Sequence, residues 1–463
     1  MASTKPVSSA VKANRTLKKH AKSSQPCVRN WIERLPCEIL IKILSYLDTA
    51  ALFTISHVSS LFYHLASDNA SWHRIFLKEF GHNRKPNPKF VEDLLKKTDD
   101  VNDLAIDHWK RLYFQTTADF DMYKWKKQCC VVNRHTGLPS KTEHVLRNLH
   151  VTWQLTVIQQ SKETSTFDLS WMKFSETSVT LCWSGTLPDL PHISALQLLG
   201  VRRIAFSRTG LKQPARRSLM LNVDMTSVSK SIQNIGQDKL VELKLLQPGI
   251  IVGLWKGQCS VAFVMFSLHL HRLVERSTKG SSVCPFVGLA AKPPFDDIDP
   301  EYGLHGYRLH ISLHNTKCNI MSESFTQLFC HKTQMCGGLM QLIAINRNRL
   351  SEHTPLSGSI SFPWRCEALQ GAVQDCCIMT LLLRDEFKFP LWCVSSAVCL
   401  KADQSAHTDY NYEGDRFLFQ FRDEVGQVEI HLVRNAEQET YTVVSLVIYI
   451  TTTKINSHFG TAY

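Results

Sequence analysis

Residues 35–72 carry more large apolar side chains than so short a segment can bury within itself. Pro36 suits a first helical turn, because its missing amide proton would be unpaired there and its φ is already helical. From Ile39 onward the apolar residues recur at helical spacing, and Asp48 and Ser60 offer polar caps for the helices that follow. Helices this short are marginal alone in water, so they must pack on one another and on a further surface. We therefore predict three or four short helices that form a docking module for another protein.

This stretch resembles the F-box, the helical motif that joins a substrate receptor to the Skp-type adaptor of cullin-RING ubiquitin ligases. The resemblance rests on a Leu-Pro pair, a run of leucines and isoleucines at helical spacing, and a closing tryptophan. Ser59 stands where the pattern usually has cysteine and Phe62 where it usually has tryptophan, so we expect the last adaptor contacts to be weaker than in typical members. The adaptor-binding residues that the resemblance implies are Leu35, Pro36, Ile39, Leu40, Ile43, Leu44, Leu47, Leu52, Val58, Phe62, Leu65 and Trp72. The alternative is an ordinary helical bundle with internal leucines, which does not demand the Leu-Pro start or the closing tryptophan.

A chain of 463 residues is long enough for two or three domains. We predict a disordered basic arm over residues 1–30, the F-box over 31–80, a helical linker over 81–147 and a β-rich substrate-recognition domain over 148–463. Within the linker, helices are expected near 90–97 and 101–127, and they would fix the angle between the F-box and the β-rich domain. The linker side chains expected to face a core are Trp109, Leu112, Tyr113 and Trp125.

From about Asn148 the apolar period changes to two, which is typical of half-buried strands. Alternating segments occur at 151–157, 179–183 and 307–314, and one face of each is expected to be wet. The segment 417–450 predicts a three-strand meander, in which Gly426 would supply a positive φ. The predicted fold class is α+β: a three- to four-helix F-box and a helical linker, then a large, mainly antiparallel β domain that is barrel- or sandwich-like. One large sheet, closed as a barrel or folded as a sandwich, is the form we expect.

The net charge of +12 is unevenly placed, because the first thirty residues hold seven basic residues and no acid. The remaining charge of +5 is spread over more than four hundred residues and is too small to form a basic surface for DNA or RNA. No nucleic-acid partner is therefore expected. The longest apolar runs fall far short of the ~20 residues of a membrane span, so no membrane partner is expected either. The Lys18-Lys19 neighbourhood could act as a weak nuclear import signal.

The fifteen cysteines include no pair separated by two residues, which disfavours zinc ribbons. An odd count without a regular framework indicates reduced thiols, and hence a cytoplasmic or nuclear location. A RING-type ligase would need repeated Cys and His ligand pairs, so this chain is not expected to carry its own RING.

No motif of a hydrolase elbow, phosphate-binding loop, dinucleotide site or zinc protease occurs, so we expect no enzyme activity and no cofactor. A zinc site between strands is a minor alternative, because the spacing of four histidines also fits solvent-facing positions of amphipathic strands: His269, His271, His310 and His314. An acidic cluster could attract a basic segment or a divalent cation, although a solvated loop is the commoner explanation: Asp296, Asp297, Asp299 and Glu301.

No internal repeat of fixed period occurs, which disfavours propeller and solenoid receptors and places the chain with the "F-box only" group. The expected function is substrate recognition in an SCF-type ubiquitin ligase, in which the adaptor links the chain to cullin and RING subunits and an unidentified target protein is held for ubiquitin transfer. Two alternatives remain: an adaptor-bound scaffold or inhibitor that ubiquitinates nothing, and a small-molecule binder built in the β-rich domain.

Overall fold

The computed structural model describes residues 32, 35–56, 58–80, 108–129, 131–203, 215–288, 292–294, 299, 301–403, 412, 414–435 and 440–463. The chain divides into two compact units, Met1–Phe114 and Gln115–Tyr463, with the boundary inside helix α6 (His108–Cys129). The predicted basic arm, the predicted helix near 90–97, and Asp296 and Asp297 of the acidic cluster lie outside the described residues.

The N-terminal unit is helical. Its helices are α1 (Cys37–Leu44), α2 (Thr49–Ile55), α3 (Ser60–Leu65), α4 (Asn69–Phe80) and the first turns of α6. No helix among the described residues is long and apolar enough to cross a membrane.

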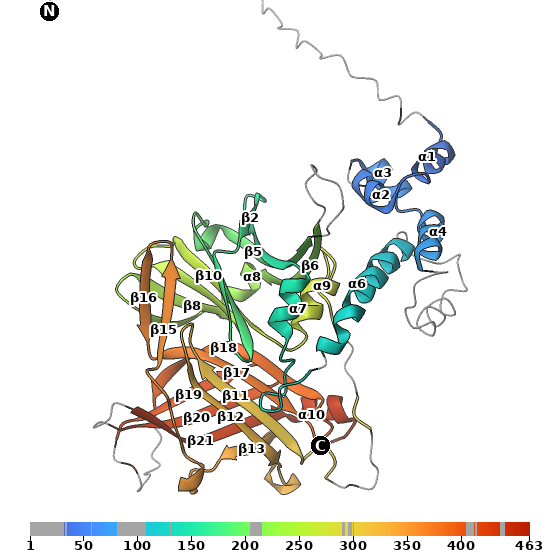
Figure 1. The fold of residues 1–463 in the computed structure, drawn as a ribbon. Helices are drawn as coiled ribbons and strands as arrows, with labels where there is room; N and C mark the ends of the chain where they lie inside the picture. The colour runs from blue at the N-terminus through green and yellow to red at the C-terminus, as the bar shows by residue number, and fades with distance from the viewer. Residues whose placement is uncertain are drawn as a thin grey trace, which may run out of the picture. The chain divides into compact units, whose positions relative to one another are not determined.

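The C-terminal unit is built from antiparallel sheets (Figure 1), as the sequence predicted. The four-stranded sheet has the order β2 (Thr164–Asp168), β1 (Val151–Gln159), β5 (Ile193–Arg203), β6 (Ala215–Asp224). The six-stranded sheet has the order β3 (Trp171–Phe174), β4 (Ser178–Ser184), β10 (Val261–His269), β9 (Ile250–Trp255), β8 (Val241–Gln247), β7 (Gln233–Gln237).

The largest sheet has nine strands. Its order is β12 (Asn319–Leu328), β11 (Tyr307–His314), β17 (Cys376–Arg384), β18 (Pro390–Ala402), β19 (Arg416–Arg422), β20 (Gly426–Asn435), β21 (Thr440–Thr451), β13 (Leu339–Ile345), and β14 (Thr354–Pro355) also pairs with β21. A two-stranded sheet joins β15 (Ser361–Cys366) to β16 (Leu369–Gln374). The helices of this unit are α7 (Thr142–Asn148), α8 (Met225–Val228), α9 (Leu273–Lys279) and α10 (Thr452–Phe459), with short 3-10 turns at Leu190–His192, Lys332–Gln334 and Leu350–Glu352.

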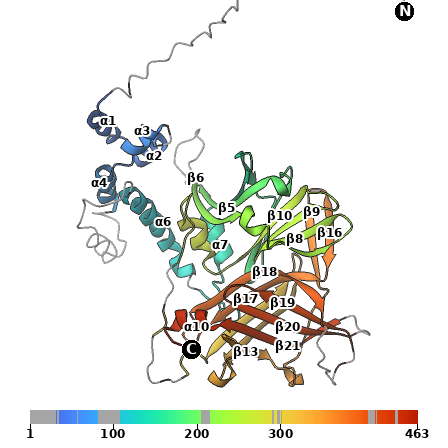
Figure 2. The same ribbon diagram turned by 180° about the vertical axis from the view of Figure 1, so that it is seen from behind.

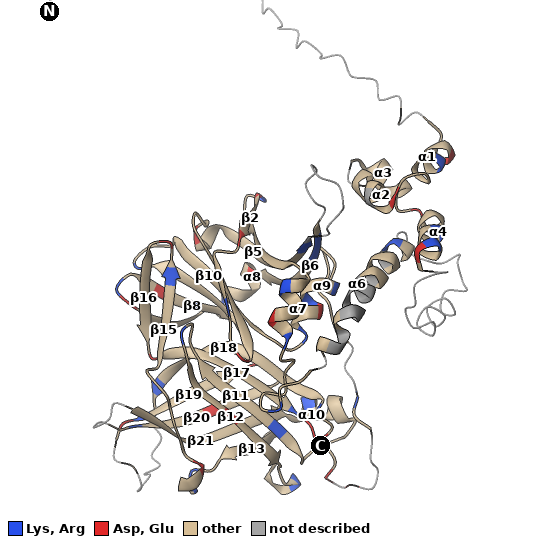
Figure 3. Ribbon diagram, in the orientation of Figure 1, with Lys and Arg blue, Asp and Glu red and all other residues tan. Residues whose placement is uncertain are grey.

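Three large cores hold the described part of the β unit together. One lies between the four- and six-stranded sheets and takes in side chains of α7 and α9. A second joins the other face of the six-stranded sheet to β15, β16, β17 and β18, and a third lies within the nine-stranded sheet with Ile455 and Phe459 of α10. Figures 1 and 2 show the four- and six-stranded sheets on one side of this unit and the nine-stranded sheet on the other. Figure 3 shows few charged residues along the strands.

The prediction of a large, mainly antiparallel β domain is confirmed, but the expectation that its strands form one sheet is wrong, because they divide among several stacked sheets. The expected alternation is present in β1, where Val151, Trp153, Leu155 and Val157 are buried in turn. The wet face expected for 179–183 and 307–314 is wrong as well, since almost every residue of β4 and β11 is buried. The physical reason is that stacked sheets cover these strands on both faces, as happens for central strands.

The predicted meander is confirmed by the pairing of β19 with β20 and of β20 with β21. The role predicted for Gly426 is wrong, because Gly426 has no positive φ. The turn is closed instead by Asp423, whose Oδ1 accepts hydrogen bonds from the backbone N–H groups of Val425 and Gly426 at 2.8 and 3.0 Å. Glycine is needed at 426 for space, since a Cβ there would lie 2.1 Å from the carbonyl oxygen of Tyr449.

Candidate adaptor-binding surface

Helices α2 and α3 of the N-terminal unit begin at polar caps. The Asp48 side chain accepts a hydrogen bond from the N–H of Ala51 at 2.8 Å, which starts α2. The Oγ of Ser59 accepts from the N–H of Phe62 at 3.3 Å and starts α3, so the cap lies one residue before the predicted Ser60. Ser59, which departs from the usual cysteine, thus serves as a helix cap in this chain.

Five residues predicted to contact the adaptor are instead the core of this unit. Their side chains are at most 8% exposed and pack with Phe76, Trp109 and Tyr113: Leu40, Leu44, Leu52, Leu65 and Trp72. The expectation of a surface position is corrected for these five, because each lies on the side of its helix that faces the neighbouring helices. Their contribution is to hold the surface helices in place.

Helix α6 completes this core. Trp109 and Tyr113 are buried in it and Leu112 packs against it, as predicted, and Trp125 packs against the core of the β unit. Lys110 is 8% exposed, and its Nζ donates to the Oγ of Ser67 at 3.1 Å. The core of the N-terminal unit is thus closed by residues that lie well beyond residue 80, where the predicted docking module ends.

A second apolar set stays at the surface. Leu35, Ile39 and Ile43 are 39%, 49% and 49% exposed, and they follow one another at intervals of four residues. Residues four apart on a helix share one face, so Ile39 and Ile43 lie on the same face of α1. Leu35 and Pro36 come directly before this helix and are exposed as well. We call this the exposed α1 row and define it as Leu35, Pro36, Ile39 and Ile43.

The remaining predicted residues lie at the margins. Val58 is 67% exposed between α2 and α3, whereas Leu47 and Phe62 are half-buried against the core. Tyr46, which the sequence analysis did not single out, is 78% exposed just after α1. Its spacing of three residues from Ile43 is the signal that could have added it to the exposed row. Contiguous exposed apolar side chains of this kind mark interaction sites.

The histidines considered for zinc do not face solvent as the sequence analysis expected. Three are at most 6% exposed because stacked sheets cover the polar faces of β10 and β11: His269, His310 and His314. His314 Nε2 lies 3.0 Å from Ser178 Oγ and 3.2 Å from Thr380 Oγ1. Among the described residues, no group of three or more His, Cys, Asp or Glu side chains is arranged to hold a metal ion.

Burial governs the charge of these imidazoles. It lowers the pKa of His314 to about 4 and that of His310 to about 4, with His135 and Arg384 adding to the effect at His310. His310 Nδ1 is paired with Ser324 Oγ at 2.8 Å. Both imidazoles are therefore neutral near pH 7 and act as hydrogen-bonding core residues.

Only part of the acidic cluster is described. Asp299 Oδ2 lies 2.6 Å from His305 Nε2, and its Oδ1 accepts from the backbone N–H of Glu301 at 2.9 Å. These bonds lower the pKa of Asp299, with the His305 hydrogen bond as the largest cause. The described part of the cluster is therefore engaged in local contacts.

Comparison with known proteins identifies the N-terminal helices as F-box-like. A protein family described as F-box-like matches residues 32–78. F-box only protein 15 of Homo sapiens is 35% identical over 452 residues, covering 96% of this chain and 88% of that protein. F-box only protein 15 of Mus musculus is 32% identical over 437 residues, covering 92% of this chain and 100% of that protein. The probable E3 ubiquitin ligase complex SCF subunit sconB of Arthroderma otae is 50% identical over 46 residues, covering 10% of this chain and 7% of that protein.

Proposed function

This chain belongs to the family of F-box only protein 15, and from that premise we propose that it is a substrate-recognition subunit of an SCF-type ubiquitin ligase. The exposed α1 row binds a Skp-type adaptor, which connects the chain to cullin and RING subunits. The β unit holds a target protein. The observation that carries this proposal is the exposed α1 row itself, which stays uncovered while five other residues of the apolar set close the core: Leu40, Leu44, Leu52, Leu65 and Trp72.

In this proposal the chain positions the target protein, and the other subunits of the ligase carry out the ubiquitin transfer. Holding a target beside the conjugating enzyme raises its effective concentration, so the ubiquitin transfer needs no nucleophile from this chain. The similarity to an SCF subunit over 46 residues supports the adaptor-binding part of the proposal. We place the protein in the cytoplasm or nucleus, which the free thiols of all the described cysteines support.

Adaptor binding can be tested with paired substitutions in the full chain. Ile39→Asp with Ile43→Asp puts two charges on the exposed α1 row without touching the buried core, and should abolish co-purification of the adaptor. Leu77→Asp is the matched control, because Leu77 is 38% exposed on α4 and outside the row. Undiminished adaptor capture by the Ile39/Ile43 variant, with unchanged circular dichroism, would refute the proposed surface.

A second experiment tests whether the chain delivers a target protein for ubiquitination. If the chain is a receptor, cullin should co-purify with it, and at least one captured protein should gain ubiquitin in a reconstituted reaction only when the exposed α1 row is intact. Capture of adaptor and cullin without ubiquitination of any bound protein would favour the scaffold alternative instead.

A further inference from the structure

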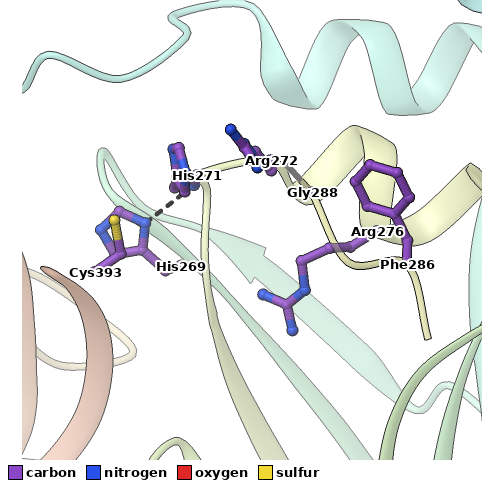
Figure 4. A pocket seen from close by; sticks show the side chains of 7 residues that line it. All are labelled: His269, His271, Arg272, Arg276, Phe286, Gly288 and Cys393. Carbon is purple, nitrogen blue, oxygen red and sulfur yellow. Dashed lines mark hydrogen bonds between the residues drawn. The ribbon is translucent and has the colours of Figure 1, made fainter. Parts of the chain in front are cut away.

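A cavity of about 280 Å³ opens in the β unit where β10 ends and α9 begins. We call it the arginine cavity. Figure 4 shows its lining, which comes from the β10–α9 junction, the segment after α9 and β18: His269, His271, Arg272, Arg276, Phe286, Gly288 and Cys393. The lining contains two arginines and two histidines and no acidic residue. Its volume suits a small ligand or a single protruding group.

Arg276 is the central charge of this cavity. Figure 4 shows its side chain extending from α9 into the space between Phe286 on one side and His269 with Cys393 on the other. Among the described residues no carboxylate forms an ion pair with Arg276. Burial lowers the pKa of Arg276, and the Cys393 thiol is the only group that acts in the opposite direction. A charged guanidinium that is desolvated without a counter-ion destabilises a protein, which is why such groups are normally paired.

The two histidines do not neutralise that charge. His269 Nδ1 accepts a hydrogen bond from the backbone N–H of His271 at 3.0 Å, so the ring proton lies on Nε2. Nε2 is buried and has no hydrogen-bond partner of ordinary geometry among the described residues. Burial lowers the pKa of His269 to about 3 and that of His271 to about 4, so both rings are neutral near pH 7. The positive charge of the cavity then comes from its arginines.

Arg272 is held beside the cavity by its backbone and by Gly288. Its φ of 51° places it in the left-handed region between β10 and α9. The Arg272 guanidinium packs against the Cα of Gly288 so closely that a Cβ there would lie 1.8 Å from Nη1. A substitution at Gly288 would therefore displace Arg272 without removing a charge, which provides a second way to perturb the site.

We propose that the arginine cavity binds an oxyanion, a phosphate or carboxylate group, through the guanidinium of Arg276 with Arg272 as the second cation. Guanidinium groups pair with both anions in a planar, two-bond geometry, and these charge-assisted hydrogen bonds are stronger than neutral ones. The anion supplies a counter-charge for Arg276, with which no carboxylate among the described residues forms an ion pair. It can come from a free small molecule or from a modified or acidic side chain of a bound protein. This inference does not rest on adaptor binding, because the cavity lies in the other unit.

The test uses the full chain and inorganic phosphate, with sodium chloride at matched ionic strength to remove general screening. Phosphate should raise the melting temperature of the β unit, because a ligand that binds only the folded state stabilises it. Arg276→Gln should weaken phosphate binding roughly tenfold or more, measured by titration calorimetry. Arg276→Lys keeps the positive charge but loses the planar guanidinium. Its affinity for phosphate should therefore lie between those of the wild type and Arg276→Gln. Arg147→Gln is the matched control, since Arg147 is a surface arginine of α7 paired with Glu143.

A distinctive readout separates a binding site from a structural arginine. In phosphate-free buffer Arg276→Gln should unfold at the same or a higher temperature, because it removes an unpaired desolvated charge, while losing the phosphate response. Gly288→Ala should also reduce the phosphate response. A phosphate response of equal size in wild type, Arg276→Gln and Gly288→Ala would overturn the proposal. So would the absence of a response both to phosphate and to phosphoserine peptides, whereas a response to the peptides alone would identify a protein-borne anion as the source.

Discussion

The indole Nε1 of Trp72 donates a hydrogen bond to the backbone carbonyl of Ala66 at 2.7 Å, inside the core of the N-terminal unit. Trp72 is 0% exposed, and its ring lies 5.4 Å from that of Tyr113 on α6. The tryptophan that closes the F-box motif therefore ties α4 to the end of α3 and to α6. Its effect on adaptor binding is expected to pass through the stability of this core.

Trp72→Phe keeps much of the ring but leaves the buried Ala66 carbonyl without its donor, so it should destabilise the N-terminal unit by about 1–3 kcal/mol. Trp72→Ala should cost about 3–5 kcal/mol. Hydrogen exchange of the α1–α4 amides in the full chain measures this loss locally. Ile39→Ala, on the exposed α1 row, should leave that protection nearly unchanged and still weaken adaptor capture. Weaker capture by Trp72→Phe with unchanged amide protection would instead indicate a direct contact.

The cap of α3 gives a comparison between adjacent residues. Ser59→Ala removes the side chain that accepts from the Phe62 N–H and should destabilise α3 by about 1 kcal/mol. Ser60→Ala changes an exposed first-turn residue and should have an effect within a few tenths of a kcal/mol. The measurement is again hydrogen exchange, read over α3. Equal effects of the two substitutions would show that Ser59 is not the cap in solution.

The helical spacing of the F-box could be predicted from the sequence, but the direction in which each side chain faces could not. Ile39 and Leu40 are neighbours of similar character, and only the packing of α1 against the other helices makes one exposed and the other buried. An apolar pattern wider than one face leaves this choice open, because periodicity records spacing and not the position of the partner helix. Trp109 was correctly expected to face a core, but its spacing did not indicate that this core is the one formed by α1 to α4.

The β unit shows which information the strand pattern lacks. Alternation identified β1 and the meander, because those strands follow a period of two. The alternation misled for β11, where the polar residues His310, Ser312 and His314 suggested a solvent-exposed face. Their side chains instead form hydrogen bonds with hydroxyl groups of neighbouring segments. Arg276 could not be singled out at all, since the absence of a counter-ion is a property of the folded environment.

The buried histidines predict an acid-sensitive β unit. The pKa of His314 is lowered by burial to about 4, against about 6.5 in an unfolded chain. The unfolded state therefore binds more protons between these values, so this stability is fully present above about pH 6.5 and is lost as the pH falls toward 4. Each such histidine contributes a slope of about 1.4 kcal/mol per pH unit in that window. The free energy of unfolding, measured with a denaturant at several pH values from 7.5 to 4.5, should show this slope. His314→Gln should reduce the slope by the contribution of one histidine, about 1.4 kcal/mol per pH unit. An identical slope in the variant would contradict the buried, neutral state.

The approach of β20 to β21 predicts that Gly426 tolerates no side chain. A Cβ at 426 would lie 2.1 Å from the Tyr449 carbonyl oxygen, which is backbone and cannot swing away. Gly426→Ala should therefore push the paired strands apart and destabilise the nine-stranded sheet by about 1–3 kcal/mol or more. Gly257→Ala is the contrasting control, because Gly257 has a φ of +74° but open space around it, so its cost is strain of about 1–2 kcal/mol without a clash. Hydrogen exchange should then show lost protection in β20 and β21 for Gly426→Ala and none there for Gly257→Ala. Full protection of both strands in Gly426→Ala would mean that the two backbones lie farther apart than described.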